Sequence, residues 1–175
     1  MTTPDPNVAA EPAYADRLTR AASEIGALRE PIDAARPWPL KLISGDGPEA
    51  EWGSPEILAH VAEALQYWLG ELERVVDGTS EPVAFGRVAT DPLRTMTIER
   101  DRTLPPGELI SRIQTSVGRY AARLPQLSAA DWQKRGIHPR LGEMTVAEIL
   151  PRFVVGHVEE HVVQLREAIA ARTTH

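Results

Sequence analysis

Two histidines, His157 and His161, stand four residues apart in the last long segment of the chain. On a helix, residues at this spacing lie about 40° apart around the axis and one turn apart along it, so both imidazoles can reach one metal ion. The spacing also predicts that they share a face with the apolar Leu150, Phe153 and Leu165. Imidazoles turned toward a core need partners for their nitrogens, and a metal ion would supply one for both. The alternative is a pair of hydrogen-bonded core histidines.

Two further side chains of this segment are candidates for a role beside the histidines. Gln164 lies about 20° from His157 on the same face, so it is predicted to orient a ligand or touch a substrate. The alternative is a buried amide satisfied by a neighbouring helix. Glu160 lies about 60° from His157 and is a candidate to support a ligand or to act as a base.

Two other histidines lie earlier in the chain. His60 falls on the flank of an apolar helical pattern, where a metal ligand would lie if the metal were near one edge of a helix bundle. The alternative is a boundary residue without a ligand role. Glu63, one helical turn beyond His60, is a candidate to support it. His138 stands in a loop with Pro139 and Gly142 and is expected to be structural.

The composition limits the classes of function that fit. The chain has 175 residues, of which 42% are hydrophobic and 25% charged, which predicts one globular domain over residues 11–175 after a disordered lead-in at 1–10. The net charge of -6 argues against nucleic acid or an anionic membrane as the main partner. With no cysteine, any metal must be held by His, Asp, Glu or water. No signal peptide and no apolar run of membrane length are evident, so a cytoplasmic location is expected.

Four amphipathic segments carry these candidates. Apolar residues recur with helical spacing over residues 12–30, 54–77, 107–124 and 145–171, which predicts an all-α fold, a four-helix bundle. The connection 79–106 shows no helix pattern, and a connection of this length is uncommon inside a compact domain. If the second and third helices run parallel, this long crossover must span the bundle, roughly 30 Å.

Helix boundaries are marked by local signals. Ser54 and Pro55 are typical of an N-cap and a first helical position. Thr145 and Glu148 form the pattern of a capping box that opens the last helix. Pro151 is expected to bend that helix slightly. These boundaries place each candidate ligand inside a helix.

The sequence resembles the DinB/YfiT-like superfamily of metal-binding proteins in two blocks of motifs. The block 52–60, which reads WGSPEILAH, is similar to the second-helix motif of that family. A later set of short motifs, in the same order as in the family, consists of Leu127-Ser128, Asp131-Trp132, His138-Pro139, Gly142, Thr145, His157, His161 and Gln164. The resemblance covers the second to fourth helices. It implies an up-down-down-up bundle, often dimeric, with one divalent metal held by His60, His157 and His161.

The resemblance also implies a range of activities. Some family members are transferases or isomerases that depend on a low-molecular-weight thiol such as mycothiol, bacillithiol or glutathione, whereas many have no known reaction. Three imidazoles on one ion leave a coordination position open, as in catalytic zinc sites, and nickel binds the same ligands. We therefore expect a zinc or nickel protein that acts on a small molecule, as a thiol-dependent transferase or isomerase or as a hydrolase. The alternative is a non-catalytic metal- or ligand-binding or structural protein of the same fold.

Two other kinds of metal site fail on spacing. The segment from His157 to His161 matches the inverted zincin pattern H-x-x-E-H, but only the 14 residues 162–175 follow it, too few for the distant ligand of that fold. A ferritin-like di-iron site needs glutamate three residues before histidine on two helices. The residues in that position before the three candidate histidines are Ile57, Val154 and Val158.

The second helix also bears on oligomeric state. Apolar residues such as Trp68 and Leu69 are spread around it more widely than one core face needs. Together with the family resemblance, this pattern predicts a homodimer.

Overall fold

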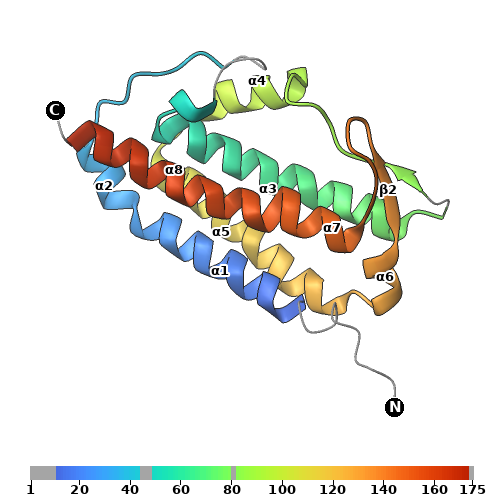
Figure 1. Ribbon diagram of the computed structural model, residues 1–175. Helices are drawn as coiled ribbons and strands as arrows, with labels where there is room; N and C mark the ends of the chain where they lie inside the picture. Colours follow the sequence, from blue (N-terminus) through green and yellow to red (C-terminus); the bar gives the residue numbers. More distant parts are fainter. Residues whose placement is uncertain (1–10, 44–48, 80–81, 174–175) are drawn as a thin grey trace.

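The computed structural model describes residues 11–43, 49–79 and 82–173, so the expected lead-in at 1–10 lies outside the described residues. Four long helices form the body of the molecule: α1 (Glu11–Ala27), α3 (Ser54–Asp77), α5 (Pro106–Arg123) and α8 (Gly156–Thr173). Their positions confirm the four-helix bundle. α1 and α3 each pack against both α5 and α8. In Figure 1, α3 and α5 run in one direction and α1 and α8 in the other, which is the expected up-down-down-up order.

The first predicted helix is divided in two. α1 ends at Ala27, and α2 (Arg29–Ala34) follows after a break at Leu28. The predicted helix over 12–30 ends just before Pro31, but in the structure Pro31 lies within the first turn of α2. A proline is tolerated there because the N–H that it lacks would have no helical partner. Ile32 is then fully buried in the core.

The crossover from α3 to α5 contains a helix that the sequence analysis missed. α4 (Pro92–Asp101) begins with Pro92, and the side chain of Asp91 caps it by accepting a hydrogen bond from the backbone N–H of Arg94 at 3.1 Å. Its buried residues are Ile98, Arg94 and Asp101. With a single aliphatic residue among them, the segment shows no apolar period. Asp91 followed by Pro92, a typical N-cap and first helical residue, was the sequence feature that could have predicted α4.

A small three-stranded sheet covers one end of the bundle (Figure 1). Its strands are β1 (Val83–Ala84), β2 (Arg135–His138) and β3 (Gly142–Thr145); β1 pairs with β2 in parallel, and β2 pairs with β3 in antiparallel register. The region 136–142 was expected to be a loop, because strands of this length give too little alternation to be recognised. Two short helical pieces, η2 (Leu124–Gln126) and α6 (Ala129–Gln133), connect α5 to the sheet.

The last helix contains a wide turn instead of a slight bend. α7 (Val146–Leu150) opens with the predicted capping box, in which Thr145 N donates to Glu148 Oε2 at 2.8 Å. A π-helical turn, η3 (Pro151–Val155), then leads into α8. The Gly156 N–H donates to the carbonyl of Pro151, and a Cβ at Gly156 would lie 2.9 Å from that oxygen.

This wide turn changes which residues of α8 face the core. Its extra residue shifts the helical phase, and the buried residues of α8 are Val158, His161, Val162, Leu165 and Ile169. His157 and His161 were expected in the middle of the stripe with Phe153. His161 is buried as expected, whereas His157 is half-buried at the edge of the stripe; both rings contact His60 of α3.

Replacing Gly86 with alanine is expected to destabilise the fold by about 2 kcal/mol, because two restraints act on this position. Gly86 has φ of 80°, and an added Cβ would lie 2.4 Å from His138 Cδ2. Urea unfolding would measure the loss. Gly118 in α5 has no atom within 4 Å of an added Cβ, so Gly118→Ala should raise stability by roughly 0.5–1 kcal/mol. Equal effects of the two changes would contradict the prediction.

None of the helices in the described part of the chain combines the length and apolar character that a membrane span requires.

Candidate metal centre

Three histidines from two helices meet at one edge of the core. α3 contributes His60, and the start of α8 contributes His157 and His161. The Nε2 atoms of His60 and His157 are 2.9 Å apart, and one ring nitrogen of each histidine lies within 4.8 Å of the other two. The ring centroids of the three pairs are 4.5 to 4.9 Å apart. The structure therefore brings together the three residues that the sequence suggested as ligands.

Burial keeps these imidazoles neutral. His60 is 3% exposed and His161 6% exposed, and His157 is half-buried. Loss of water contact lowers the pKa of His60 well below its usual value, and the nearby charges of His157, His161, Arg94 and Arg87 lower it further. Burial, followed by the charge of His161, lowers the pKa of His157 to about 3. The pKa of His161 is lowered as well, mainly by burial. Neutral imidazole is the form that binds metal.

A chain of hydrogen bonds sets the orientation and tautomer of His161. Gln164 Nε2 donates to the backbone carbonyl of Glu49 at 2.5 Å, so its Oε1 is turned toward His161. That oxygen lies 2.7 Å from His161 Nδ1, which must therefore carry the proton and donate. His161 Nε2 then bears the lone pair. This atom is buried and has no hydrogen-bond partner among the described residues.

The nitrogen positions fit a shared ion. Zinc–nitrogen bonds are about 2.0–2.1 Å long, so two ligands of a tetrahedral site are roughly 3.3 Å apart. The 2.9 Å between the Nε2 atoms of His60 and His157 is close to this value. One nitrogen of each of the three rings lies within 4.8 Å of the other two, and a modest change of side-chain rotamer would bring them to the tetrahedral separation. The buried, unpartnered Nε2 of His161 is the kind of atom that a metal would satisfy. The donor set therefore suits one divalent ion.

A pocket of about 190 Å³ opens beside His60 and His157. Its other lining residues are Glu49, Ala64, Trp68, Arg87, Val88, Ala89, Arg94 and Phe153. Trp68 and Phe153 form a stacked aromatic pair with centroids 4.4 Å apart. Phe153 was expected to share the histidines' face, and it lies in the same pocket wall. The pocket places aromatic surface and charged groups next to the candidate ligands.

Sequence reasoning missed the charged residues of this pocket. Glu49 comes from the short helical turn η1 (Glu49–Glu51), and Arg94 comes from α4. Arg94 is 6% exposed, and its guanidinium hydrogen-bonds to the Glu49 carboxylate and the Ala89 carbonyl. Arg87 follows β1 and pairs with Glu63 at 2.6 Å. An N-cap at α4 was the signal that could have placed Arg94 in a helix.

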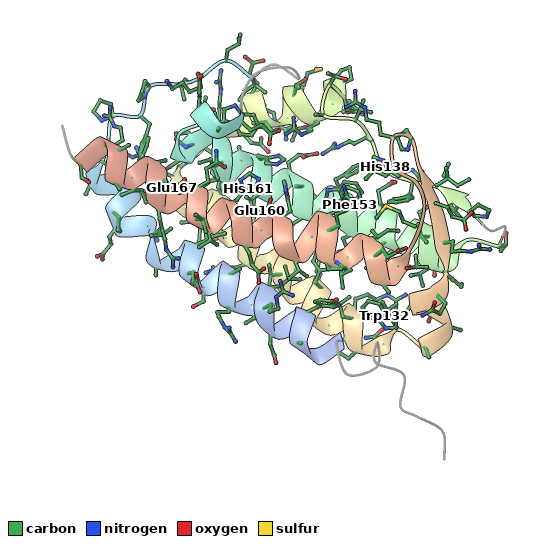
Figure 2. All side chains as sticks on the ribbon, viewed as in Figure 1. Trp132, His138, Phe153, Glu160, His161 and Glu167 are labelled. Carbon is green, nitrogen blue, oxygen red and sulfur yellow. The ribbon has the colours of Figure 1, made fainter. Side chains whose placement is uncertain are left out.

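The acidic candidates Glu160 and Glu63 are not part of the cluster of ligand atoms that the three histidines form. Glu160 is exposed on α8, and its charge only partly offsets the lowering of the His161 pKa by burial (Figure 2). Its role as a base stays a prediction. Glu63 is half-buried in an ion pair with Arg87, and burial raises the pKa of its carboxyl. Glu63 therefore supports Arg87 and not, as expected, His60.

His138 has a structural environment, as expected. Its Nδ1 accepts hydrogen bonds from the backbone N–H groups of Arg140 and Leu141 at 3.2 and 3.3 Å, which closes the turn between β2 and β3. Its ring stacks on Phe153 with centroids 5.2 Å apart (Figure 2). It therefore supports the pocket wall from behind.

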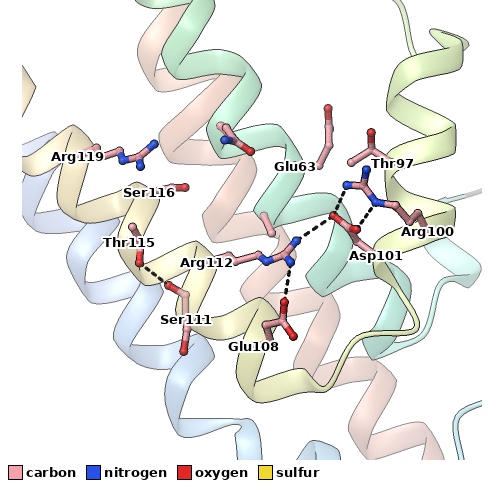
Figure 3. Close-up of a pocket in the computed structure, with 12 residues that line it drawn as sticks. Glu63, Thr97, Arg100, Asp101, Glu108, Ser111, Arg112, Thr115, Ser116 and Arg119 are labelled. Atoms are coloured by element: carbon pink, nitrogen blue, oxygen red, sulfur yellow. Dashed lines mark hydrogen bonds and ion pairs between the residues drawn. The ribbon is translucent and has the colours of Figure 1, made fainter.

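A larger hollow of about 480 Å³ lies between α3, α4 and α5 (Figure 3). It is lined by charged and hydroxyl side chains, and Asp101 forms ion pairs there with Arg100 and Arg112. None of the three histidines is among its lining residues. Volume alone therefore does not identify the site, and the chemistry of the lining favours the smaller pocket.

The metal-free protein is expected to lose stability as the pH falls below about 6.5. The pKa of His157 is about 3 in the fold and near 6.5 in the unfolded chain, so the unfolded chain binds more protons below pH 6.5. Between pH 7.5 and 5.5, His157 alone should lower the free energy of unfolding by about 1 kcal/mol. Urea unfolding with a chelator at both pH values would measure this. The loss should be smaller in His157→Gln, and an equal loss in both proteins would contradict the assignment.

Comparisons with known proteins agree with this fold. Residues 10–165 match the family model of the DinB superfamily. Among solved structures, YfiT from Bacillus subtilis superposes with a TM-score of 0.75 at 16% sequence identity, over 99% of this chain and 93% of that one. That protein is described as a probable metal-dependent hydrolase with an unusual four-helix bundle topology. A search of curated proteins finds no match. The family match covers most of the chain, and the chain therefore belongs to the DinB superfamily.

Proposed function

We propose that this protein is a mononuclear metalloenzyme that acts on a small molecule. The observation that carries the proposal is the set of three neutral, clustered imidazoles beside a pocket, with a buried and unpartnered Nε2 on His161. His60, His157 and His161 would hold one divalent ion, zinc or nickel. Three protein ligands leave room for a substrate, which is the arrangement of catalytic zinc sites.

The ion, when bound, would act as a Lewis acid that polarises an oxygen of the substrate and promotes deprotonation of a bound water or thiol. The chain's own residues hold and enclose the site. Gln164 and the backbone of Glu49 keep His161 in the tautomer that ligates through Nε2. Buried Trp52 packs in a T-shaped arrangement against His60, with ring centroids 5.5 Å apart, and covers that side of the ring.

Two reaction classes fit this chemistry. Hydrolysis is supported by the description of YfiT, which has the same fold. Transfer or isomerisation with a low-molecular-weight thiol fits as well, because a metal site holds a thiol as its thiolate. For hydrolysis, Glu160 at the exposed edge of α8 is the candidate proton acceptor. The competing possibility is a closed, non-catalytic site in which the metal only links α3 to α8.

The deciding experiment is metal analysis of protein purified without a histidine tag. We expect close to one zinc or nickel ion per chain. Replacement by Co²⁺ would report coordination, because its visible absorption changes when a small thiol enters an open position. A spectrum unchanged by saturating thiol would favour the non-catalytic alternative. Protein that neither retains nor takes up a divalent ion would refute the proposal.

We also propose that the protein forms a homodimer. Trp68 and Leu69, the residues behind that expectation, are both partly buried against the core, and Trp68 stacks on Phe153 within the chain. Exposed apolar side chains elsewhere support the proposal instead. Val163 on α8 is 52% exposed, and Leu93 and Met96 on α4 are 72% and 65% exposed. Light scattering at micromolar concentration should give twice the chain mass of 19.2 kDa. A single-chain mass would contradict the proposal.

A further inference from the structure

The charged groups that line the pocket beside the histidines are all paired within the protein. Its charged lining residues are two arginines, Arg87 and Arg94, and one carboxylate, Glu49. Arg94 is engaged by Glu49 and by the carbonyl of Ala89. Arg87 is paired with Glu63, which lies behind it on α3. The protein's own charges therefore balance before any ion is bound.

A divalent ion would disturb this balance. Neutral imidazoles donate lone pairs but no negative charge, so the ion would keep both of its positive charges. Glu49 is the only carboxylate among the described residues that line the pocket, and it is already paired with Arg94. Charge that is removed from water needs a counter-charge. The loaded pocket would favour a ligand that brings negative charge.

Arg87 is placed to recognise such a ligand. Its guanidinium lies over the ring of Tyr67 at 3.8 Å from the centroid, and its side chain is 11% exposed. In the described part of the chain, its side-chain hydrogen bonds engage Nη2 alone, which leaves Nε and Nη1 free to donate. A planar guanidinium held by stacking and an ion pair is preorganised for the two oxygens of a carboxylate.

The uncharged walls of the pocket determine the size and shape of the part of the ligand that carries no charge. Trp68 and Phe153 present aromatic surface, and Ala64, Val88 and Ala89 are small or apolar. The volume of about 190 Å³ is below the range typical of pockets for drug-sized ligands. A peptide or a nucleotide would not fit within it. A small, flat organic acid matches both the charge and the walls.

We propose that this pocket selects small organic carboxylates, with the carboxylate on Arg87 and the carbon skeleton against Trp68 and Phe153. The inference rests on the proposed function, because the charge imbalance arises from the bound ion. It adds the substrate class to that function.

Benzoate and its neutral isostere benzamide are suitable probes for calorimetric titration of the zinc-loaded protein. We expect benzoate to bind at least roughly tenfold more tightly, because only benzoate gains charge-assisted hydrogen bonds. Arg87→Gln should weaken benzoate binding by roughly tenfold and leave benzamide binding and zinc content unchanged. Glu63→Gln should strengthen benzoate binding a few-fold, because it releases Arg87 Nη2 from its ion pair.

Two further variants keep the test decisive. Glu63→Gln/Arg87→Gln removes the buried ion pair without leaving a lone charge, so it serves if Arg87→Gln folds poorly. Arg119→Gln alters an exposed arginine of the separate hollow in Figure 3 and should change nothing. Equal affinity for benzoate and benzamide, or full benzoate affinity without Arg87, would overturn the inference.

Zinc content measured on the same samples separates the two proposals. A wild-type protein that takes up no zinc overturns the proposed function and this inference with it. Zinc-loaded protein that does not discriminate between the probes overturns this inference alone. Inorganic phosphate that binds more tightly than benzoate would overturn the assignment to carboxylates.

Discussion

His157→Ala is expected to reduce zinc affinity by at least a hundredfold and to leave the purified protein nearly free of metal. The side chain provides one of three proposed ligands, and its Nε2 is 2.9 Å from that of His60. Loss of a supporting contact behind a ligand already weakens metal sites by roughly 10–100-fold, so loss of the ligand itself should weaken them more. Metal analysis after dialysis and competition with a coloured chelator would measure the change.

The same substitution should remove the stabilisation that metal gives to the fold. An ion present at 1,000 times its dissociation constant stabilises the folded state by about 4 kcal/mol. For a chain of this length, that corresponds to a melting temperature higher by roughly 10 °C. Zinc should therefore raise the melting temperature of the wild-type protein and have little effect on His157→Ala.

His138→Ala is the matched control for this prediction. His138 packs behind Phe153 and closes the β2–β3 turn, so its loss should lower stability in the presence and absence of metal alike. Zinc per chain should remain close to the wild-type value. If His138→Ala lost as much zinc as His157→Ala, the assignment of the three ligands would be wrong.

Glu56→Ala is expected to destabilise the protein by roughly 3–5 kcal/mol, because it removes one partner of a buried charged network. The Glu56 side chain is fully buried at the start of α3, one turn before His60. It accepts hydrogen bonds from the backbone N–H groups of Lys41 at 2.8 Å and Gly53 at 3.2 Å, and it faces Arg102 at 3.4 Å. Without it, two backbone donors lose their acceptor, and Arg102 keeps the Lys41 carbonyl and Glu99 but loses its buried carboxylate partner.

Glu56→Gln tests the cause of this effect. The two backbone N–H groups donate to different oxygens of Glu56, so glutamine keeps an acceptor for one of them, places its NH2 against the other, and loses the charge opposite Arg102. We therefore expect a smaller loss, about 1–2 kcal/mol. Urea unfolding of both variants at pH 7 would give the two values. If Glu56→Ala lost less than about 1 kcal/mol, the network would be a by-product of packing and not a support of the helix that carries His60.

The sequence by itself determined the four long helices, because their signals are local. Apolar period and terminal residues such as Ser54 with Pro55, or Thr145 with Glu148, act between near neighbours. Thr145 is the predicted N-cap, whereas α3 begins one residue earlier than predicted, with Gly53 and not Ser54 at its N-cap. The length of the crossover predicted parallel second and third helices. The candidate ligands followed from the same local geometry, since the spacing of His157 and His161 fixes their relative direction on any helix.

Tertiary structure alone decided what surrounds the histidines. Glu49 and Arg94 are 45 residues apart in sequence, and neither belongs to an apolar repeat, so nothing local links them. The wide turn at Pro151 moved His157 from the middle of the predicted stripe to its edge, where it meets α3. Ion pairs of this kind depend on which surfaces meet when the bundle forms, because a buried charge needs a partner and that partner can come from any part of the chain. The rotation of α8 likewise depends on how the helix packs against α1 and α3.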